Sequence, residues 1–155
     1  STASLPADPH PFVDRRESIM PMTHVSMRKG QPAAFRAAVL EAIHESLQKS
    51  LDVHPEAFFM TISEHEDANF HANMTYPFVR SANLLLIQIT LTAGRSTGDK
   101  QRFYRNLVAR LEAGSGIKPA DVFINLIEVA SENWSPGNGL PIATALQPDA
   151  AHGPG

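Results

Sequence analysis

The strongest hydrophobic pattern in the chain lies in residues 84–91, where Leu85, Ile87, Ile89 and Leu91 share one face of a predicted strand. The other face holds Leu84, Leu86, Gln88 and Thr90. A strand that is apolar on nearly both faces is typical of the inner part of a sheet. A turn at Gly94 follows, and Ser96 with Asp99 has the form of a shortened capping box. This spacing predicts that a second helix begins after Ser96.

The first half of the chain shows strand, helix and strand patterns in that order. Residues 22–27 can form a short strand, and Pro32 suits the first turn of a helix. Apolar residues then recur every four positions, which predicts an amphipathic helix of about four turns. A proline at position 55 ends this helix, and residues 57–64 alternate as a second strand. Residues 66–83 read as a long polar loop. The apolar stripe of the helix consists of Phe35, Val39, Ile43, Leu47 and Leu51.

The second half repeats this plan when the chain is shifted against itself by 64 positions. The shift aligns turn glycines, helix stripes, helix-ending prolines and strands, with identities at Gly30 and Gly94, Leu47 and Leu111, Pro55 and Pro119, Phe59 and Phe123, and Glu64 and Glu128. We therefore predict an α/β (α+β) fold of two pseudo-repeated β-α-β units, residues 22–64 and 84–128. They would form a four-stranded mixed sheet with both helices on one face. The other face would lack a cover, so we expect the chains to associate.

Composition limits the other possibilities. The 155 residues, of which 43% are hydrophobic, suffice for one domain, predicted at residues 21–146. A proline-rich N-terminal extension, residues 1–20, and a tail, residues 147–155, are expected to be flexible. The net charge of −3 gives no reason to expect a nucleic acid or a membrane as partner. There is no cysteine, which excludes disulfides and thiolate metal sites and fits a cytoplasmic location.

Several motifs together resemble the tautomerase superfamily (4-oxalocrotonate tautomerase-like). These are Met20-Pro21 before the first strand, the paired β-α-β units, Gly94-Arg95-Ser96, and the segment 132–139 around Trp134. Within the superfamily, the chain is most similar to the malonate semialdehyde decarboxylase-like branch over residues 21–139. The resemblance implies a homotrimer whose sheets face inward, and it implies no cofactor.

The resemblance also implies roles for individual residues. Pro21 matches the amino-terminal proline that acts as the base after the initiator Met is removed. Arg95 matches the arginine that binds the substrate carboxylate, and Trp134 matches an aromatic wall of the pocket. Arg80, in the well-matched Arg80-Ser81 pair, is a further candidate for binding a small carboxylate substrate.

Three positions depart from the decarboxylase pattern. Its activating aspartate is Ala57 here, its second arginine is Ala93, and a phenylalanine of its pocket is Pro136. These differences make decarboxylase or hydratase activity a weaker expectation than isomerase activity. We therefore expect a keto–enol tautomerase that acts on a small 2-keto acid or enol carboxylate.

Each of these residues also has a purely structural interpretation. Pro21 can simply open an edge strand, and Trp134 can cover part of the core. Arg95 can be a solvated side chain, although a cation is unfavourable at a helix N-terminus. The alternative to an enzyme is a catalytically silent trimer with a binding or structural role. His44, His65 and His71 lack the spacing of metal ligands, so no metal is expected.

Overall fold

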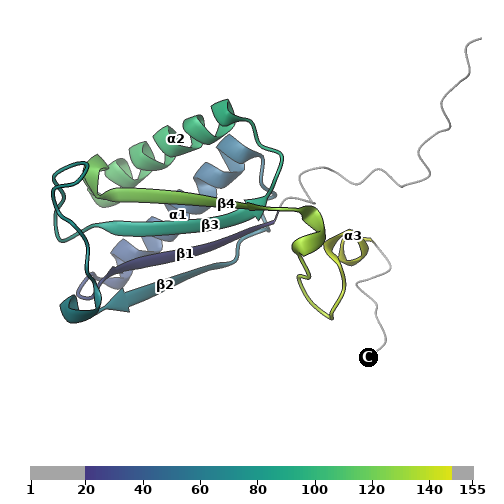
Figure 1. Cartoon of the computed structure of the whole chain (residues 1–155), viewed down its shortest axis with the longest axis horizontal. Coiled ribbons are helices and arrows are strands. Elements are labelled where there is room, and N and C mark those ends of the chain that lie inside the picture. The colour runs from purple at the N-terminus through teal and green to yellow at the C-terminus, as the bar shows by residue number, and fades with distance from the viewer. Residues whose placement is uncertain (1–19, 148–155) are drawn as a thin grey trace, which may run out of the picture.

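A computed structural model describes residues 20–147, and it forms one mixed sheet with two long helices on one face (Figure 1). The predicted N-terminal extension, apart from Met20, and the predicted tail beyond residue 147 lie outside the described residues. The strands are β1 (Pro21–Arg28), β2 (Met60–His65), β3 (Leu85–Thr92) and β4 (Val122–Val129), and their order in the sheet is β2-β1-β3-β4. The long helices are α1 (Ala33–Leu51) and α2 (Thr97–Ser115).

The structure confirms the predicted fold class. β1 and β2 are parallel, β3 and β4 are parallel, and β1 and β3 run antiparallel at the centre. The strand predicted from residues 84–91 is therefore an inner strand. Its four alternate apolar residues are at most 1% exposed, because both helices pack against that face.

Some predicted boundaries were wrong. α1 has 19 residues, or about five turns rather than four. β2 begins at Met60 rather than at residue 57; the N–H groups of Ala57 and Phe58 make turn bonds, and only the Phe59 carbonyl bonds to β1, through the Thr23 N–H at 2.9 Å. The polar loop after β2 is not wholly irregular, because it contains a short 3-10 helix, η1 (Asp67–Asn69).

The internal repeat is closer than five identities suggested. β1 and β3 start and end 64 positions apart, and so do α1 and α2. The turn glycines Gly30 and Gly94 adopt nearly the same left-handed conformation, with φ of 119° and 125°. Equivalent ion pairs follow: Arg36 contacts Glu64 in the first unit, and Lys100 contacts Glu128 in the second.

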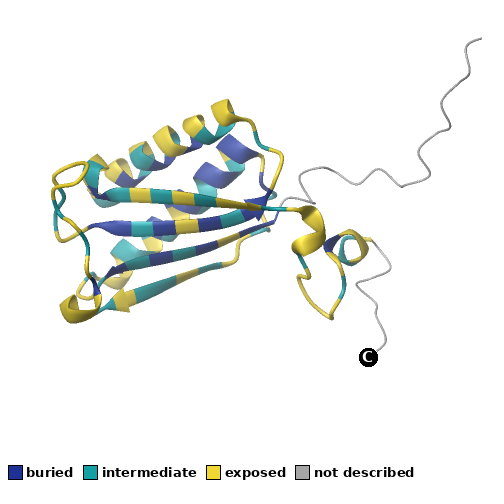
Figure 2. Cartoon of the chain, viewed as in Figure 1, coloured by how far each residue is buried: buried dark blue, intermediate teal, exposed yellow. Residues whose placement is uncertain are grey.

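The sheet face opposite the helices is uncovered within the described chain, and exposed and partly exposed residues gather on it (Figure 2). This face is more mixed than the sequence predicted. Met22, Phe59 and Phe123 are about half exposed there, but a polar row of Thr61, His24, Gln88 and Asn125 crosses the four strands between them.

Candidate active site

Pro21 lies at the end of the sheet where β1 starts and where β3 and β4 finish. Its ring is buried, and its register partner is Leu91 near the end of β3. Met20 before it is also buried, and the Met20 backbone N–H donates a hydrogen bond to the Thr92 hydroxyl oxygen at 3.3 Å. The Pro21 nitrogen is therefore placed at this end of the sheet as part of the Met20–Pro21 peptide bond.

Arg95 lies in the short turn between β3 and α2, and both flanks of the turn are fixed. On one side, the Gly94 N–H donates to Glu128 Oε2 at 3.3 Å. On the other, the Ser96 hydroxyl accepts a hydrogen bond from the Asp99 N–H and caps α2, as the sequence predicted. A side chain at position 94 would be strained, because the φ of Gly94 is +125°.

The carboxylate that fixes this turn is Glu128. Lys100 donates a hydrogen bond to Glu128, and this contact is the main reason that the pKa of the carboxyl group lies below its ordinary value. Partial burial opposes that shift, and the Gly94 N–H and the positive charge of Lys100 add to it. Glu128 therefore stays ionised at neutral pH and keeps the Gly94 N–H bonded next to Arg95.

Trp134 comes to the same end of the sheet from the end of β4. The chain turns through a short 3-10 helix, η3 (Ser131–Asn133), and the Trp134 N–H donates to the Ser131 carbonyl. The Trp134 carbonyl in turn accepts a hydrogen bond at 3.0 Å from the N–H of Ile142, the buried first residue of α3 (Ile142–Ala145). The backbone of Trp134 is thus held from both sides.

Two side-chain donors at this end have no partner within the described chain. The Arg95 Nε and the Trp134 indole Nε1 are both buried, and neither makes a hydrogen bond with residues 20–147. A buried donor without an acceptor costs about 1–3 kcal/mol, and more when the group is charged. Hydrogen-bond acceptors of a ligand, such as carboxylate or carbonyl oxygens, would remove this cost.

A cavity of about 870 Å³ begins at Met22, the residue after Pro21, and lies along β1 and β2; Pro21, Arg95 and Trp134 do not line it. Half of its ten lining residues are apolar: Met22, Leu40, Phe58, Phe59 and Met60. The Thr23 hydroxyl, which also lines the cavity, is buried without a hydrogen-bond partner in the described chain.

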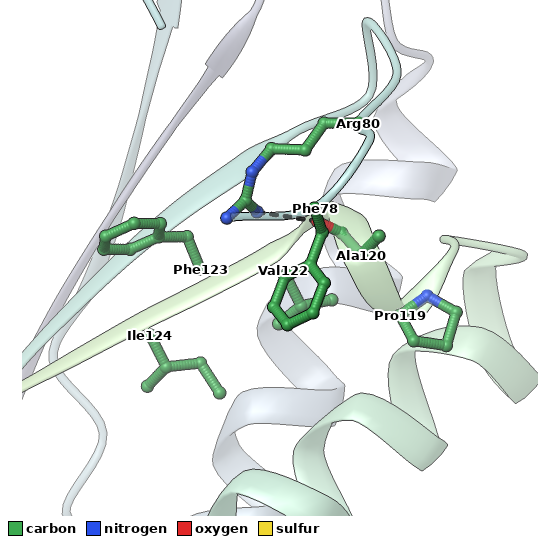
Figure 3. A pocket seen from close by; sticks show the side chains of 7 residues that line it. All are labelled: Phe78, Arg80, Pro119, Ala120, Val122, Phe123 and Ile124. Carbon is green, nitrogen blue, oxygen red and sulfur yellow. Dashed lines mark hydrogen bonds between the residues drawn. The ribbon is translucent and has the colours of Figure 1, made fainter. Parts of the chain in front are cut away.

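Arg80 does not lie with the other three predicted site residues. It precedes β3, and its guanidinium donates from Nη1 to the Ala120 carbonyl just before β4 (Figure 3). Arg80 therefore lies near the start of β3, whereas Pro21 lies beside the end of β3. The eight residues of this strand span on the order of 25 Å. Within one chain, Arg80 therefore does not lie beside Pro21, and its role in binding a small carboxylate substrate stays a prediction.

The three departures from the decarboxylase pattern also occur near the Pro21 end. Ala57 precedes β2 and packs against the core, and the Ala93 N–H pairs with the Val129 carbonyl at the end of β4. Pro136 is exposed after η3. This end thus lacks the acid and the second arginine that those positions would supply. Among residues 20–147, no three potential metal ligands of the His, Asp or Glu type come together.

The sequence reasoning missed Glu128 and Lys100 as the groups that fix the Arg95 turn. The repeat contained the signal, since it aligned Glu64 with Glu128, but that alignment did not show which cation each carboxylate would contact. The sequence reasoning also missed that Phe70 is the counterpart of Trp134 in the first repeat. Phe70 directly follows η1, and Trp134 directly follows η3.

The chain is similar to several known proteins. A family model described as "Tautomerase enzyme" matches residues 57–137. The probable tautomerase YusQ of Bacillus subtilis is 31% identical over 121 residues, which cover 77% of this chain and 95% of YusQ. The probable tautomerase YrdN of the same organism is 27% identical over 121 residues, or 77% of this chain and 93% of YrdN.

The similarity extends to solved structures. A structure of malonate semialdehyde decarboxylase superimposes with a TM-score of 0.73 and 25% identity, covering 79% of this chain and 95% of that one. A fused 4-OT protein solved as a symmetric trimer shares the fold, with a TM-score of 0.68 and 21% identity. The match covers 81% of this chain and 99% of the fused protein. No helix among the described residues is long and apolar enough to cross a membrane. The match of the family model to more than half of the sequence, together with the close similarity to YusQ, shows that the chain belongs to the tautomerase family.

Proposed function

We propose that this protein is a keto–enol tautomerase for small 2-keto acids or enol carboxylates, with Pro21 as the base once its amine is freed. The observation that carries the proposal is the pair of buried, unpartnered donors, Arg95 Nε and Trp134 Nε1, at the end of the sheet where Pro21 lies. In this proposal Arg95 binds the substrate carboxylate and Trp134 forms a wall of the pocket.

The proposed reaction moves one proton and needs no cofactor. The neutral amine of Pro21 would take a proton from the carbon next to the keto group, while the electrons of that C–H bond form the enol double bond. The carbonyl oxygen gains the negative charge and then receives the proton from the prolinium, which leaves the enzyme unchanged. The reverse sequence ketonises an enol.

The surroundings of Pro21 support its role as a base. A free α-amine has an ordinary pKa of about 7.7–8.0. Apolar burial lowers the pKa of an amine, because it disfavours the charged form. Pro21 is buried, and apolar side chains make up half of the lining of the cavity that begins at the next residue, Met22. A freed Pro21 amine would thus be neutral in a large fraction of molecules at physiological pH.

The peptide bond between Met20 and Pro21 sets the condition for activity. In an amide, the proline nitrogen has no proton to exchange and its lone pair is delocalised into the carbonyl group. We expect the 155-residue chain to show little proline-dependent activity, and a chain that begins at Pro21 to show it. The test is ketonisation of a simple enol carboxylate by both forms. Equal activity of the two forms would rule out Pro21 as the base.

The second candidate is a catalytically silent trimer with a binding or structural role. It is favoured by the alanines at positions 57 and 93, which leave the Pro21 end without the acid and the second arginine of the decarboxylase pattern. Inactivity of both forms, with the fold intact, would support this candidate.

The homotrimer is part of both candidates. The uncovered sheet face, with Met22, Phe59 and Phe123 about half exposed, supports association through that face. Light scattering coupled to size exclusion should give three times the mass of one chain, and a monomer at micromolar concentration would contradict it. The cytoplasmic location and the absence of nucleic-acid and membrane partners stay predictions from composition.

A further inference from the structure

Thr92 is the last residue of β3, and it lies at the Pro21 end of the sheet. On the side of β1, its hydroxyl oxygen accepts the hydrogen bond from the Met20 N–H at 3.3 Å. On the side of β4, Thr92 is in register with Val129, and the N–H of the next residue, Ala93, donates to the Val129 carbonyl at 2.8 Å. Thr92 is only 8% exposed. Its position is therefore fixed from both sides before any ligand binds, which lowers the entropic cost of binding.

Met20 fills the space next to Thr92 in the 155-residue chain. Met20 is buried, and its carbonyl carbon is bonded to the Pro21 nitrogen. The backbone nitrogens of successive residues are three bonds apart, so the Thr92 hydroxyl lies within about 7 Å of the Pro21 nitrogen. Loss of residues 1–20 would therefore open the space that Met20 fills, directly beside the freed amine.

The order of the residues at this end matches the order of the reacting atoms in a 2-keto acid. Such an acid has a carboxylate, a keto carbon and the carbon that loses a proton in a row, so the keto oxygen lies between the two ends. In the proposed reaction, Arg95 binds the carboxylate and Pro21 takes the proton. Leu91 is the register partner of Pro21, and Thr92 comes between Leu91 and Arg95. The keto oxygen would thus lie within reach of the Thr92 hydroxyl.

We propose that the Thr92 hydroxyl donates a hydrogen bond to the keto oxygen of the substrate, in the space that Met20 fills in the 155-residue chain. This role rests on the proposed function and adds a substrate-binding residue to it. A hydroxyl group can donate as well as accept, so the oxygen that accepts from the Met20 N–H can donate to a keto oxygen. No proton leaves Thr92 in this role. The bond becomes stronger as the keto oxygen gains negative charge, so Thr92 would stabilise the enolate more than the bound keto acid.

The test uses the chain that begins at Pro21, which keeps the four strands and both long helices described above because β1 begins at that residue. Two probes that do not react separate binding from chemistry. Oxamate has a carboxylate and a carbonyl oxygen on the next carbon, whereas propionate lacks that oxygen. Titration followed by NMR should show that oxamate binds about three- to tenfold more tightly than propionate. The 155-residue chain should lose the binding of oxamate, because Met20 fills the space.

Either of two results with the chain that begins at Pro21 would overturn the proposal. One is the absence of oxamate binding, and the other is equal affinity for oxamate and propionate.

Variants of the same chain then test Thr92 itself. Thr92→Val removes the hydroxyl at nearly constant size, so it should abolish the preference for oxamate and leave propionate binding unchanged. Retained propionate binding also shows that the variant is folded. Thr92→Ser keeps a hydroxyl and should keep the preference. Thr90→Val is the matched control, on the same side of β3 but two residues farther from Arg95, and should keep the preference too. An unchanged preference in Thr92→Val, or its loss in Thr90→Val or Trp134→Phe instead, would contradict the proposal.

Failure of this role can be told apart from failure of the proposed tautomerase. In an active enzyme, Thr92→Val should lower kcat by about tenfold or more, because a hydrogen bond to a developing charge is lost. If Pro21-dependent activity is found but Thr92→Val binds oxamate normally, the reaction stands and the role of Thr92 is refuted. If no activity is found but the oxamate preference depends on Thr92, the reaction is refuted and the binding role of Thr92 stands.

Discussion

The two repeats build two comparable ends of one sheet, but the side chains at equivalent positions of the two ends differ, and the proposed active site lies at only one of them. At the Pro21 end, the three key positions are Pro21, Arg95 and Trp134, and both side-chain donors are buried without a partner in the described chain. Their counterparts, 64 positions earlier or later, are Leu85, Gln31 and Phe70. The same backbone thus carries different side chains at its two ends.

At the counterpart end, the positions equivalent to Pro21, Arg95 and Trp134 make contacts within the chain. Leu85 is 1% exposed and belongs to the core. The Gln31 amide donates to the Asn83 side chain at 2.7 Å, and the Arg28 guanidinium stacks 4.5 Å from the centre of the Phe70 ring. Asp67 pairs with Arg28 from the far side. One buried nitrogen at the counterpart end, His65 Nε2, also has no partner among residues 20–147. The residue equivalent to His65 at the Pro21 end is Val129, which has no side-chain donor.

This difference shows where the side chains of the two repeats diverge. In the first repeat, the bulky Arg28 covers the Phe70 ring. The counterpart of Arg28 in the second repeat is the smaller Thr92, at the end of the sheet that also holds Trp134. The repeat supplies the same turn and the same short 3-10 helix at both ends. Within the described chain, the Arg95 and Trp134 donors at the Pro21 end have no partner, whereas Gln31 at the counterpart turn is hydrogen-bonded to Asn83.

The largest expected effect comes from the arginine that distinguishes the two turns. In the chain that begins at Pro21, Arg95→Ala should lower kcat/KM by roughly 10²-fold, because a charged hydrogen bond to the substrate is lost where water is largely excluded. Gln31→Ala, at the counterpart position, is the matched control and should change kcat/KM by less than about twofold. Unchanged kinetics in Arg95→Ala would show that this arginine does not contact the substrate.

A smaller effect is expected from the indole nitrogen. Trp134→Phe keeps an aromatic ring but removes the Nε1 donor, and it should lower kcat/KM by about three- to tenfold, the usual value of one neutral hydrogen bond. Phe70→Leu, at the counterpart position, should lower the free energy of unfolding by about 1 kcal/mol and leave kcat/KM unchanged. The comparison fails if Phe70→Leu reduces activity as much as Trp134→Phe does.

The smallest effect concerns the two equivalent ion pairs. The pKa of Glu128 is lowered in the folded protein, mainly by Lys100, so its contribution to stability is present above the unfolded-state pKa and is lost as the pH falls through the folded value. In Glu128→Gln, the free energy of unfolding should therefore fall less between about pH 5 and pH 3 than it does in the unchanged protein. The difference should be less than about 1 kcal/mol.

Glu64→Gln is the control for that prediction, because Arg36 and Glu64 make the equivalent contact at 3.6 Å in the first repeat. Glu128→Gln should also lower kcat/KM modestly, since it weakens the bond to the Gly94 N–H beside Arg95, whereas Glu64→Gln should not. Melting curves across pH, with kinetics at neutral pH, measure both effects. Equal changes in activity for the two variants would contradict a special role for the Glu128 contact.

Much of the fold could be predicted from the sequence, because local periodicity and the repeat agree. The alternation in residues 84–91 and the four-residue spacing from Phe35 to Leu51 both reflect burial against a single core. The start of β2 was misjudged, since residues 57–59 alternate like a strand, but Ala57 and Phe58 form backbone bonds of a turn, such as the Phe58 N–H to the Glu56 carbonyl.

The site could be predicted only in part. The resemblance identified Pro21, Arg95 and Trp134 by their motifs, and strand order brings them to one end of the sheet. A motif match does not show at which end of a strand a loop residue lies, so the separation of Arg80 from the other three within one chain was not predicted. The contact of Lys100 with Glu128 depends on how α2 packs against β4, which no local pattern reveals.

The most direct measurement is the exchange of the hydrogens on the carbon next to the keto group of a 2-keto acid in D₂O, followed by NMR. The chain that begins at Pro21 should speed this exchange, and Pro21→Ala in the same chain should reduce the enzymatic rate by about 10²-fold or more. The 155-residue chain should resemble the Pro21→Ala variant, because its proline nitrogen is in an amide. Equal exchange rates for the chain that begins at Pro21 and for its Pro21→Ala variant would contradict the assignment of Pro21 as the base.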